Sequence, residues 1–350
     1  MVLLIMKKAS KYGTHRVIKP KGGLPQPAEK IDNTMELYDN EILINVHTLN
    51  IDSASFTQIK KEANNDEEKI AKIMKKIVAD RGKHHNPVTG SGGMLVGEVE
   101  KIGSSLAGKI DLEVGDKIAT LVSLSLTPLV IEEIKEIRKD TDQVDIKGKA
   151  ILFESGIYAK LPEDMPQNLA LAVLDVAGAP AQTAKLVKPG DSVLIIGAGG
   201  KSGTLCLHEA KKRAGISGKV IALEYSEEGC DRVKKLDLAD VVIQADATKA
   251  PEVLEKIEEV TKGDLVDLTI NCVNIPNTEM SSILPTKDTG KVYFFSMATS
   301  FTAAALGAEG VGKDTEMLIG NGYTKNHAEI ALQVLRENKK IKELFKKIYI

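Results

Sequence analysis

The segment Ser192-Val-Leu-Ile-Ile-Gly-Ala-Gly-Gly-Lys-Ser-Gly203 decides the fold of the second half of this chain. It begins with an apolar run of strand length, Ser192–Ile196, passes through a glycine-rich turn, and leads into a helical pattern at 204–213. A buried strand, a glycine-rich turn and a helix in this order are typical of the phosphate-binding turn of a doubly wound α/β domain. In such a turn the glycines let the backbone approach a pyrophosphate, which the free N–H groups of the helix start then bind.

The glycines of this turn keep only part of the strict dinucleotide-binding pattern. They fit the spacing GxxGxxG at Gly197, Gly200 and Gly203, whereas Ser202 stands where GxGxxG has its last glycine. An ATP-type loop does not match, because Lys201 and Ser202 precede the final glycine. An ordinary strand-to-helix turn would carry similar glycines. The candidate phosphate-binding residues are Gly197, Gly199, Gly200, Lys201, Ser202 and Gly203.

Glu224 supplies the second signal, because it ends the next apolar strand, Lys219–Glu224. A carboxylate roughly 20 residues beyond the glycines accepts hydrogen bonds from the ribose hydroxyls of a dinucleotide. The same charge would repel a 2′-phosphate, so the sequence predicts NAD rather than NADP as the cofactor. The alternative is a solvated acid at a strand end.

Further apolar strands alternate with helices down to the end of this half, at 241–243, Val266–Asn271 and 290–296. This alternation predicts a parallel sheet that is covered on both faces. Nucleotides bind at the carboxyl ends of such strands, so the residues there are candidate contacts for the nicotinamide ribose. For Cys272 an inert buried thiol is the alternative. These candidates are Asn271, Cys272, Val273 and Ser296.

The first half has a different pattern, with short strand-like runs at 41–47, 90–103 and 114–119. Between them, apolar residues at helical spacing predict a helix over 66–79. Short strands with close turn signals favour a compact β-barrel-like unit. Beyond it we expect an Ala/Leu-rich helix at 169–186, and near the C-terminus an amphipathic helix at 326–338 followed by a solvated Lys-rich end.

Composition excludes several classes of protein. The chain has 350 residues with Lys+Arg 47 and Asp+Glu 49, a formal net charge of −2 that argues against nucleic-acid binding. The three cysteines, Cys206, Cys230 and Cys272, form no CxxC motif, so a zinc knot and a disulfide framework are not expected. The apolar stretch at 1–6 is too short for a signal sequence or a membrane span, which predicts a cytoplasmic protein.

The order of these parts resembles the medium-chain dehydrogenase/reductase superfamily. The strings that carry the likeness are VGEVEKIG at 96–103, KIDLEVGDKIATL at 109–121, LVKPGDSVLIIGAGGKSG at 186–203 and HAEIALQVLREN at 327–338. The resemblance implies a GroES-like catalytic domain at 1–176, a Rossmann domain at 177–320, a return to the catalytic domain at 321–350, and an active cleft between the domains.

Zinc-dependent members of that superfamily carry Cys, Gly-His-Glu and Cys motifs at three places. Here those places hold Asn50-Ile-Asp-Ser53, Gly90-Ser-Gly92 and Asp175-Val176. Adjacent residues such as His84 and His85 would point to opposite sides of a strand, so they do not easily share a metal. We therefore expect no catalytic zinc and no other metal.

Longer strings resemble the 3,5-diaminohexanoate dehydrogenase family, among them LNIDSASFTQI at 49–59, RGKHHNPVTGSGGM at 81–94 and FFSMATSFTAAALGAEGVGKD at 294–314. This resemblance implies NAD-dependent oxidative deamination of (3S,5S)-3,5-diaminohexanoate to 5-amino-3-oxohexanoate in lysine fermentation. It also implies a small diamino acid as the binding partner, neither nucleic acid nor membrane, and a homodimer or homotetramer that forms through the 293–301 region.

Amine oxidation needs a base for the ammonium, a held water, and anchors for the substrate's charges. Asp52 and Asp175 are the candidate bases, with an Asx-type turn cap and a buried carboxylate bonded to backbone amides as their respective alternatives. Ser53, Thr89 and Ser91 are candidates for holding water, unless they only satisfy backbone groups. Arg81 and Lys83 could clamp a carboxylate, and His47 and His85 could move protons, unless these are solvated charges and packed histidines. Less supported candidates are Tyr158 and Lys325.

Two other functions compete with this one. A zinc-free quinone or enoyl reductase using NAD(P)H belongs to the same superfamily, but the NADPH-dependent form would need a basic residue where Glu224 stands. A non-catalytic nucleotide-binding protein is disfavoured by the polar set at Asp52, Ser53, Thr89 and Ser91.

Overall fold

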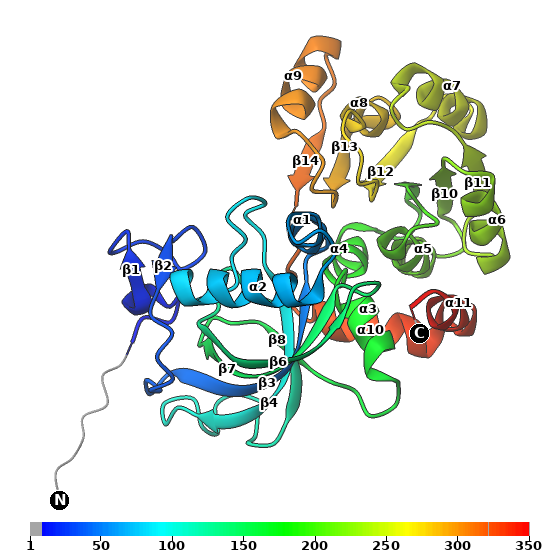
Figure 1. Ribbon diagram of the computed structural model, residues 1–350. Coiled ribbons are helices and arrows are strands. Elements are labelled where there is room, and N and C mark those ends of the chain that lie inside the picture. The colour runs from blue at the N-terminus through cyan, green and yellow to red at the C-terminus, as the bar shows by residue number, and fades with distance from the viewer. Residues whose placement is uncertain (1–8, 321, 350) are drawn as a thin grey trace, which may run out of the picture. The chain divides into compact units, whose positions relative to one another are not determined.

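The computed structural model describes residues 9–320 and 322–349, and it divides into two compact units. Unit 1 is Met1–Glu163 and unit 2 is Asp164–Ile350. Each unit contains a six-stranded sheet within its described residues (Figure 1). The apolar N-terminal stretch at 1–6, which the sequence suggests is too short for a signal, lies outside the described residues.

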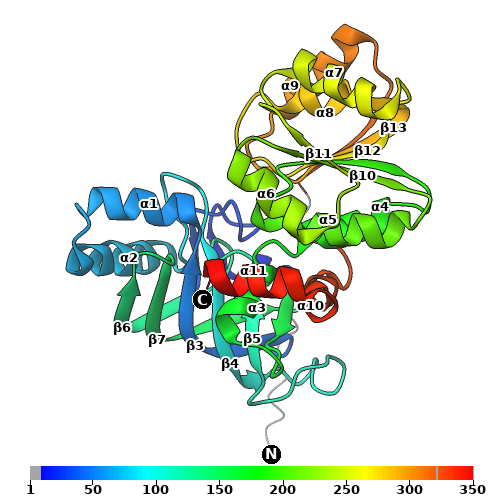
Figure 2. The same cartoon turned by 90° about the vertical axis from the view of Figure 1, so that its right-hand side faces the viewer.

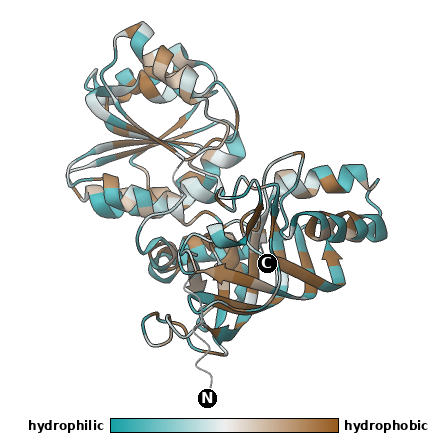
Figure 3. Cartoon of the chain, turned by 90° about the vertical axis from the view of Figure 1, so that its left-hand side faces the viewer, coloured by the Kyte–Doolittle hydropathy of each residue, from teal (hydrophilic) through white to brown (hydrophobic). Residues whose placement is uncertain are grey.

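Unit 1 is built on an antiparallel sheet with the strand order β6-β7-β3-β4-β5-β8. Its apolar side chains face inward, with Ile44, Leu49 and Leu95 completely buried, and Figure 3 shows the hydrophobic colour concentrated on these strands. This confirms the predicted β-barrel-like unit. The strands are β3 (Glu41–Ile51), β4 (Gly93–Ile102), β5 (Lys117–Thr120), β6 (Leu129–Arg138), β7 (Gln143–Phe153) and β8 (Tyr158–Lys160).

Two helices and a small two-stranded sheet complete unit 1. The predicted helix at 66–79 is confirmed as α2 (Glu67–Arg81), which Asp66 caps and whose buried face includes Ile70 and Met74. It ends at Gly82, which has φ 74° and where a Cβ would lie 2.1 Å from the carbonyl oxygen of Ile31, so only glycine fits. The remaining elements are α1 (Ser53–Glu62), β1 (Val17–Lys19) and β2 (Lys30–Ile31).

Unit 2 contains a parallel sheet with the order β11-β10-β9-β12-β13-β14. Helices cover both faces, with α4, α5 and α6 on one side and α7, α8 and α9 on the other (Figure 2). The predicted doubly wound fold is confirmed. The strands are β9 (Ser192–Ile196), β10 (Lys219–Glu224), β11 (Val241–Gln244), β12 (Val266–Asn271), β13 (Thr286–Phe294) and β14 (Glu316–Ile319). The helices are α4 (Gly178–Leu186), α5 (Lys201–Ala214), α6 (Glu227–Leu236), α7 (Ala250–Thr261), α8 (Glu279–Ile283) and α9 (Phe301–Val311).

The order of these strands determines where a ligand can bind. Within this sheet the first strand in the sequence is β9. The chain then runs outward through β10 and β11 and returns to β12 on the other side of β9. Parallel sheets with this order bind nucleotides at the carboxyl ends of the two strands where the direction reverses. Here those two strands are β9 and β12, and the glycine-rich turn follows β9 directly.

The helix expected at 169–186 is interrupted. It forms α3 (Gln167–Leu174) and α4, with a break around Val176. Pro180 explains the break, because proline donates no hydrogen bond and its ring clashes with the carbonyl four residues earlier, whereas the first turn of a helix tolerates it. The prediction of one continuous helix was therefore wrong.

The C-terminal segment also differs from expectation. The predicted helix at 326–338 is confirmed as α10 (His327–Glu337), but the Lys-rich end forms another helix, α11 (Lys339–Tyr349), with Ile341 and Phe345 buried. Both helices contact α3 within unit 2, and the contacts divide the chain between Glu163 and Asp164. No helix within 9–320 and 322–349 combines the length and apolar character needed to cross a lipid bilayer.

Candidate active site

The strand-turn-helix segment of unit 2 is closely packed around its glycines. Gly197 directly follows β9 with φ 78°, a conformation that L side chains rarely adopt. A Cβ at Gly203 would lie 2.1 Å from the carbonyl oxygen of Gly197, so glycine is required where α5 passes the strand end. Gly200 is the N-cap of α5 and offers no side-chain acceptor, which leaves the first-turn N–H groups available to a phosphate.

Glu224 lies beside this turn, as the sequence predicts. Its Oε1 accepts a hydrogen bond from the N–H of Gly199 at 2.8 Å, and its Oε2 accepts one from the N–H of Tyr225 at 3.0 Å. On the other side of the turn, Arg232 of α6 donates from Nη1 to the carbonyl oxygen of Gly199 at 2.8 Å. The backbone of Gly199 is thus held on both sides, its N–H by a carboxylate and its carbonyl oxygen by a guanidinium. Arg232 was missed from the sequence, although its i,i+4 spacing from Glu228, with which it forms an ion pair, was visible.

Lys201 and Asp175 form an ion pair, with Nζ 2.9 Å from Oδ2. Lys201 opens α5 and Asp175 is the C-cap of α3, so the pair joins two helices of unit 2. The proposed role of Asp175 as a base depended on its burial, but the side chain is 43% exposed. The structure therefore does not show the buried carboxylate that was the alternative for this residue, and its role as a base stays a prediction. Ser202 is buried behind the turn.

The residues expected to contact the nicotinamide ribose behave differently from one another. Asn271 is completely buried and donates to the hydroxyls of Thr278 and Ser282, each at 2.9 Å, so its amide serves the protein interior. Ser296 is also buried, and its Oγ accepts from the N–H of Ala298 at 3.1 Å. Of these four candidates, only the two residues that follow Asn271 are half-buried. They are Cys272, whose Sγ lies 3.9 Å from that of the buried Cys206, and Val273, which packs against Gly197.

In unit 1, β3 and β4 approach each other closely at their ends, because Ile51 pairs with Gly93 and a Cβ there would lie 2.1 Å from the carbonyl oxygen of Asn50. The approach brings Asp52 next to Ser91, whose Oγ donates to Asp52 Oδ1 at 3.0 Å. Two more hydroxyls extend this contact. Ser55 Oγ lies 2.7 Å from the hydroxyl oxygens of both Ser91 and Thr89. We call the four side chains the hydroxyl–carboxylate network: Asp52, Ser55, Thr89 and Ser91.

The network has one anchored side and one open side. Asp52 is the N-cap of α1 and accepts from the N–H groups of Ala54 and Ser55, so the alternative to a base is a helix cap and not the Asx-type turn cap expected from the sequence. It is nevertheless exposed, as is Thr89, so both remain accessible to a ligand. Ser55 was missed from the sequence. Its spacing from the cap was visible, but its burial follows from the approach of β3 and β4. Ser53 is exposed and starts α1.

The loop after α2 places its charged residues in different environments. Lys83 is completely buried, and its Nζ donates to the carbonyl oxygens of Pro25 and Gln26 at 2.6 and 3.1 Å. Burial and the charge of Arg81 lower the pKa of Lys83 to about 8. Lys83 therefore holds the β1–β2 connection, and its expected role as a carboxylate clamp was wrong. Arg81 is half-buried and forms no hydrogen bond or ion pair with a described residue.

The two histidines of this loop both have a lowered pKa. His84 is completely buried, its ring nitrogens have no partner among the described residues, and burial lowers its pKa to about 4. His85 is half-buried, and burial together with the charges of Lys83 and Arg81 lowers its pKa. A proton shuttle at His85 would thus work with a weakly basic imidazole. Of the less supported candidates, His47 and Lys325 are exposed and Tyr158 donates to Asp111.

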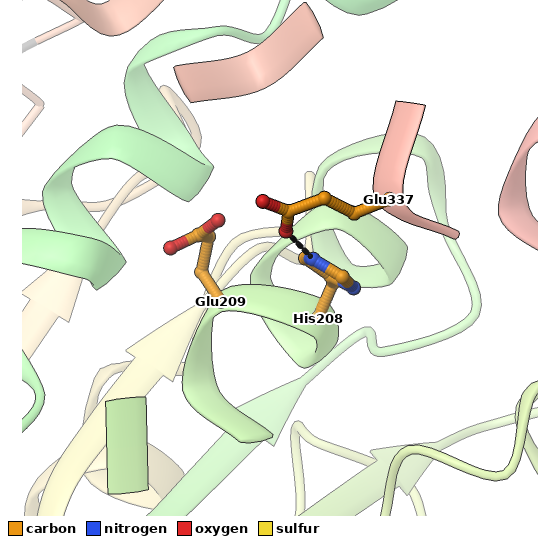
Figure 4. Close-up of side chains that lie close together, drawn as sticks. All are labelled: His208, Glu209 and Glu337. Carbon is orange, nitrogen blue, oxygen red and sulfur yellow. Dashed lines mark hydrogen bonds and ion pairs between the residues drawn. The ribbon is translucent and has the colours of Figure 1, made fainter. Parts of the chain in front are cut away.

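One group in the described part of unit 2 has the donor set of a metal site. The ligand atoms of His208, Glu209 and Glu337 lie within 4.8 Å of one another (Figure 4). Both carboxylates are already neutralised, because Lys212 lies 2.8 Å from both oxygens of Glu337 and Arg213 donates to Glu209 at 3.1 Å. Partial burial opposes ionisation, but the bonds from Lys212 and His208 prevail and lower the pKa of Glu337 to about 2. The ion pairs of Glu337 join α5 to α10, that of Glu209 lies within α5, and we assign the group no metal.

Comparison with known proteins places these sites in a family. The chain is 65% identical over 343 residues to the L-erythro-3,5-diaminohexanoate dehydrogenase of Acetoanaerobium sticklandii, covering 98% of this chain and 100% of the relative. It is 62% identical over 345 residues to the enzyme of the same name from Fusobacterium nucleatum subsp. nucleatum, covering 99% and 100%. This chain belongs to the L-erythro-3,5-diaminohexanoate dehydrogenase family. It is therefore an oxidoreductase.

Matches to family models follow the division into two units. Residues 15–162 match the family described as L-erythro-3,5-diaminohexanoate dehydrogenase N-terminal domain, which is most of unit 1. Residues 203–311 match the family described as zinc-binding dehydrogenase. This second match lies in unit 2 and does not include positions 50–53 or 90–92, where the superfamily's zinc ligands would be expected.

Solved structures support the fold of this diaminohexanoate dehydrogenase family member. A mycobacterial quinone oxidoreductase superposes with a TM-score of 0.53 at 17% identity, covering 93% of this chain and 85% of the other. At this identity the likeness shows the fold alone.

Proposed function

We propose that this chain catalyses the NAD-dependent oxidative deamination of (3S,5S)-3,5-diaminohexanoate to 5-amino-3-oxohexanoate, as a step of lysine fermentation. The observation that carries the NAD assignment is the hydrogen bond between Glu224 and the N–H of Gly199, which fixes a carboxylate at the glycine-rich turn. The substrate assignment is supported by the names and the high identity of the relatives.

The turn fits a dinucleotide on the evidence of its own backbone. The N-terminus of α5 has no side-chain cap, and its N–H groups with the helix dipole suit a pyrophosphate. Glu224 suits the ribose hydroxyls and would repel a 2′-phosphate. Val273 and Cys272 at the end of β12 border the same turn, since a Cβ at Gly197 would contact Val273. When bound, NAD supplies the hydride acceptor for the reaction.

The reaction also needs proton transfers that unit 1 can supply. Substrate, NAD⁺ and water give the ketone, ammonium, NADH and one proton, so a group must remove a proton from the substrate ammonium before hydride leaves. Asp52 is the carboxylate we assign to this step, because it is exposed and bonded to Ser91. Thr89, Ser91 and Ser55 form a continuous chain of hydroxyls that can hold the attacking water and pass protons.

A second copy of the chain is the protein partner that unit 2 suggests. Strand β14 is the edge of the described sheet, and α9 beside it exposes Phe301, Leu306 and Val311, which are 69%, 63% and 50% exposed. An apolar helix face next to an unpaired strand edge is a typical interaction surface. We propose a homodimer or homotetramer that forms through this edge.

Spectrophotometry of the purified protein tests the proposed function. NAD with 3,5-diaminohexanoate should give NADH, and NADP should support a much lower rate. Reduction of a quinone or an enoyl thioester by NADPH, with no turnover of the diamino acid, would support the reductase alternative and overturn the proposal.

A further inference from the structure

Unit 1 contains a cavity of about 450 Å³ that lies beside the hydroxyl–carboxylate network. Helix α1 contributes Gln58 and Glu62 to its walls, the second half of α2 contributes Asp80 and Arg81, and the turn after the histidines contributes Val88. The volume lies within the range of about 300–1,000 Å³ that small-molecule sites have. A six-carbon diamino acid would fit.

Arg81 is the unusual group in this cavity. It is half-buried, yet its guanidinium forms no hydrogen bond or ion pair with any described residue. Other partly or fully buried arginines of unit 1 are paired, as Arg16 is with Glu41 at 2.6 Å and Arg138 is with Asp145. A guanidinium has five donors in a planar fork that matches a carboxylate, and the Arg81 nitrogens are not among the buried polar atoms that lack a partner, so they are accessible to a ligand in the cavity.

The surroundings of Arg81 favour an anion there. The charge of Arg81 disfavours the charged form of the nearby Lys83 and so contributes to the lowered pKa of Lys83. The charges of Arg81 and Lys83 also lower the pKa of His85. The nearby carboxylate of Glu29 interacts with Arg81 only through its charge, because it is paired with Lys19 at 2.8 Å. A bound carboxylate would relieve this mutual repulsion.

The cavity wall is joined to the hydroxyl–carboxylate network by one buried residue. Asn86 donates from Nδ2 to Gln58 Oε1 at 2.8 Å and to the carbonyl oxygen of Ser55 at 3.3 Å. Its Oδ1 accepts from the N–H of Val88 at 2.8 Å and from that of Thr89 at 3.3 Å. Ser55 and Thr89 of the network therefore share a rigid support with Gln58 and Val88 of the cavity.

We propose that this cavity is the carboxylate subsite of the enzyme and that Arg81 binds the C1 carboxylate of the substrate while the C3 amine meets the hydroxyl–carboxylate network. The inference rests on the proposed function. It assigns the distal ammonium at C5 to the carboxylates Glu62 and Asp80, which line the same cavity. Arg81 is thus the residue that selects an amino acid over a plain diamine.

The test compares 3,5-diaminohexanoate with its primary amide, which lacks the carboxylate charge, in the full-length protein with NAD. Wild type should lose about 10- to 100-fold in kcat/KM on the amide, the range expected for a charge-assisted pair. Arg81→Gln should lose a similar factor on the acid and almost nothing further on the amide, and Arg81→Lys should recover part of the loss. Lys72→Ala, an exposed cation on the same helix outside the cavity, is the matched control.

Equal losses on both substrates would show that Arg81 is structural, and unchanged kinetics on the acid would also overturn the proposal. Thermal unfolding and the Kd for NAD identify a variant that fails to fold. If wild type turns over neither the acid nor the amide, the proposed function fails. The role of Arg81 is then tested separately by the Kd of each of these two compounds, measured by calorimetry. A tenfold weaker binding of the acid alone to Arg81→Gln would still support the subsite.

Discussion

The carboxylate of Glu224 accepts a hydrogen bond from the backbone N–H of Gly199 at 2.8 Å. This contact joins the end of β10 to the turn after β9, so the acid lies beside the backbone that would cradle a pyrophosphate. A dinucleotide would compete for the same N–H and offer ribose hydroxyls to the same carboxylate. The contact therefore links the choice of cofactor to a single side chain.

Replacement of Glu224 by Ala should weaken NAD binding by about 10- to 100-fold, because the hydrogen bonds between a carboxylate and the ribose hydroxyls are lost. The variant should also discriminate less against NADP, since the repelling charge is gone. Fluorescence titration with both cofactors measures these effects. Glu227→Ala, an exposed acid in the first turn of α6, is the control and should leave both affinities unchanged. Equal behaviour of the two variants would contradict the role of Glu224.

Asp52 can be tested as a base separately from its role as a cap. Asp52→Asn keeps an acceptor for the N–H groups of Ala54 and Ser55 but loses the charge, so kcat should fall at least about 100-fold at nearly constant stability. Asp52→Ala should also lose about 1 kcal/mol of unfolding free energy. Steady-state kinetics and urea unfolding measure the two effects, with Thr57→Ala on the exposed face of α1 as control. Full activity in Asp52→Asn would reduce Asp52 to a helix cap.

Glu41 is the main buried acid of unit 1. Its carboxylate accepts from Arg16 Nε at 2.6 Å, from Arg16 Nη2 at 2.7 Å and from His15. Burial opposes ionisation, but these bonds prevail and lower the pKa of Glu41 to about 2. Glu41→Gln should therefore cost about 3–5 kcal/mol of unfolding free energy near neutral pH, because it leaves the charge of Arg16 buried without its partner.

The same pair predicts a pH dependence. Because the pKa of Glu41 in the folded protein lies below its ordinary value of 4.5, its stabilisation is complete above that value and is lost as the pH falls toward 2. The difference between wild type and Glu41→Gln should shrink over that window in urea unfolding. Glu100→Gln, which breaks a half-exposed pair with Lys149, should cost less than about 1 kcal/mol. A difference in unfolding free energy between wild type and Glu41→Gln that stays constant with pH would argue against the pair of Glu41 with Arg16.

Leu306→Glu on the exposed face of α9 should convert the assembled protein to monomers, because a charge would have to be buried at the proposed edge contact. Light scattering coupled to gel filtration measures the mass. Ile216→Glu, at a fully exposed apolar position elsewhere in unit 2, should leave the mass unchanged. A monomeric wild type, or an unchanged mass in Leu306→Glu, would show that this face of α9 is not a subunit interface.

The fold was largely predictable because its signals are local. The strand at 192–196, the turn and the start of α5 follow from apolar runs and glycine spacing, and Glu224 follows from its place at the next strand end. The break between α3 and α4 required the steric effect of Pro180. Strand β14 is short and only partly buried, so it leaves little pattern to detect.

The site was only partly predictable because it depends on contacts distant in sequence. Asp52 and Ser91 were separate candidates from the sequence, but Ser55 and Asn86 join them only through the approach of β3 to β4. Burial of single residues was also not predictable. Lys83 is completely buried although the alternative was a solvated charge, and the Asp175 side chain is 43% exposed although the alternative was a buried carboxylate.

The stoichiometry of the reaction tests the central claim most directly. Purified protein, NAD and 3,5-diaminohexanoate are incubated to completion, and NADH, ammonium and the keto product are each quantified. The account predicts the three products in equal amounts, with formation dependent on NAD. NADH formation without release of ammonium, or ammonium release without NADH, would contradict it.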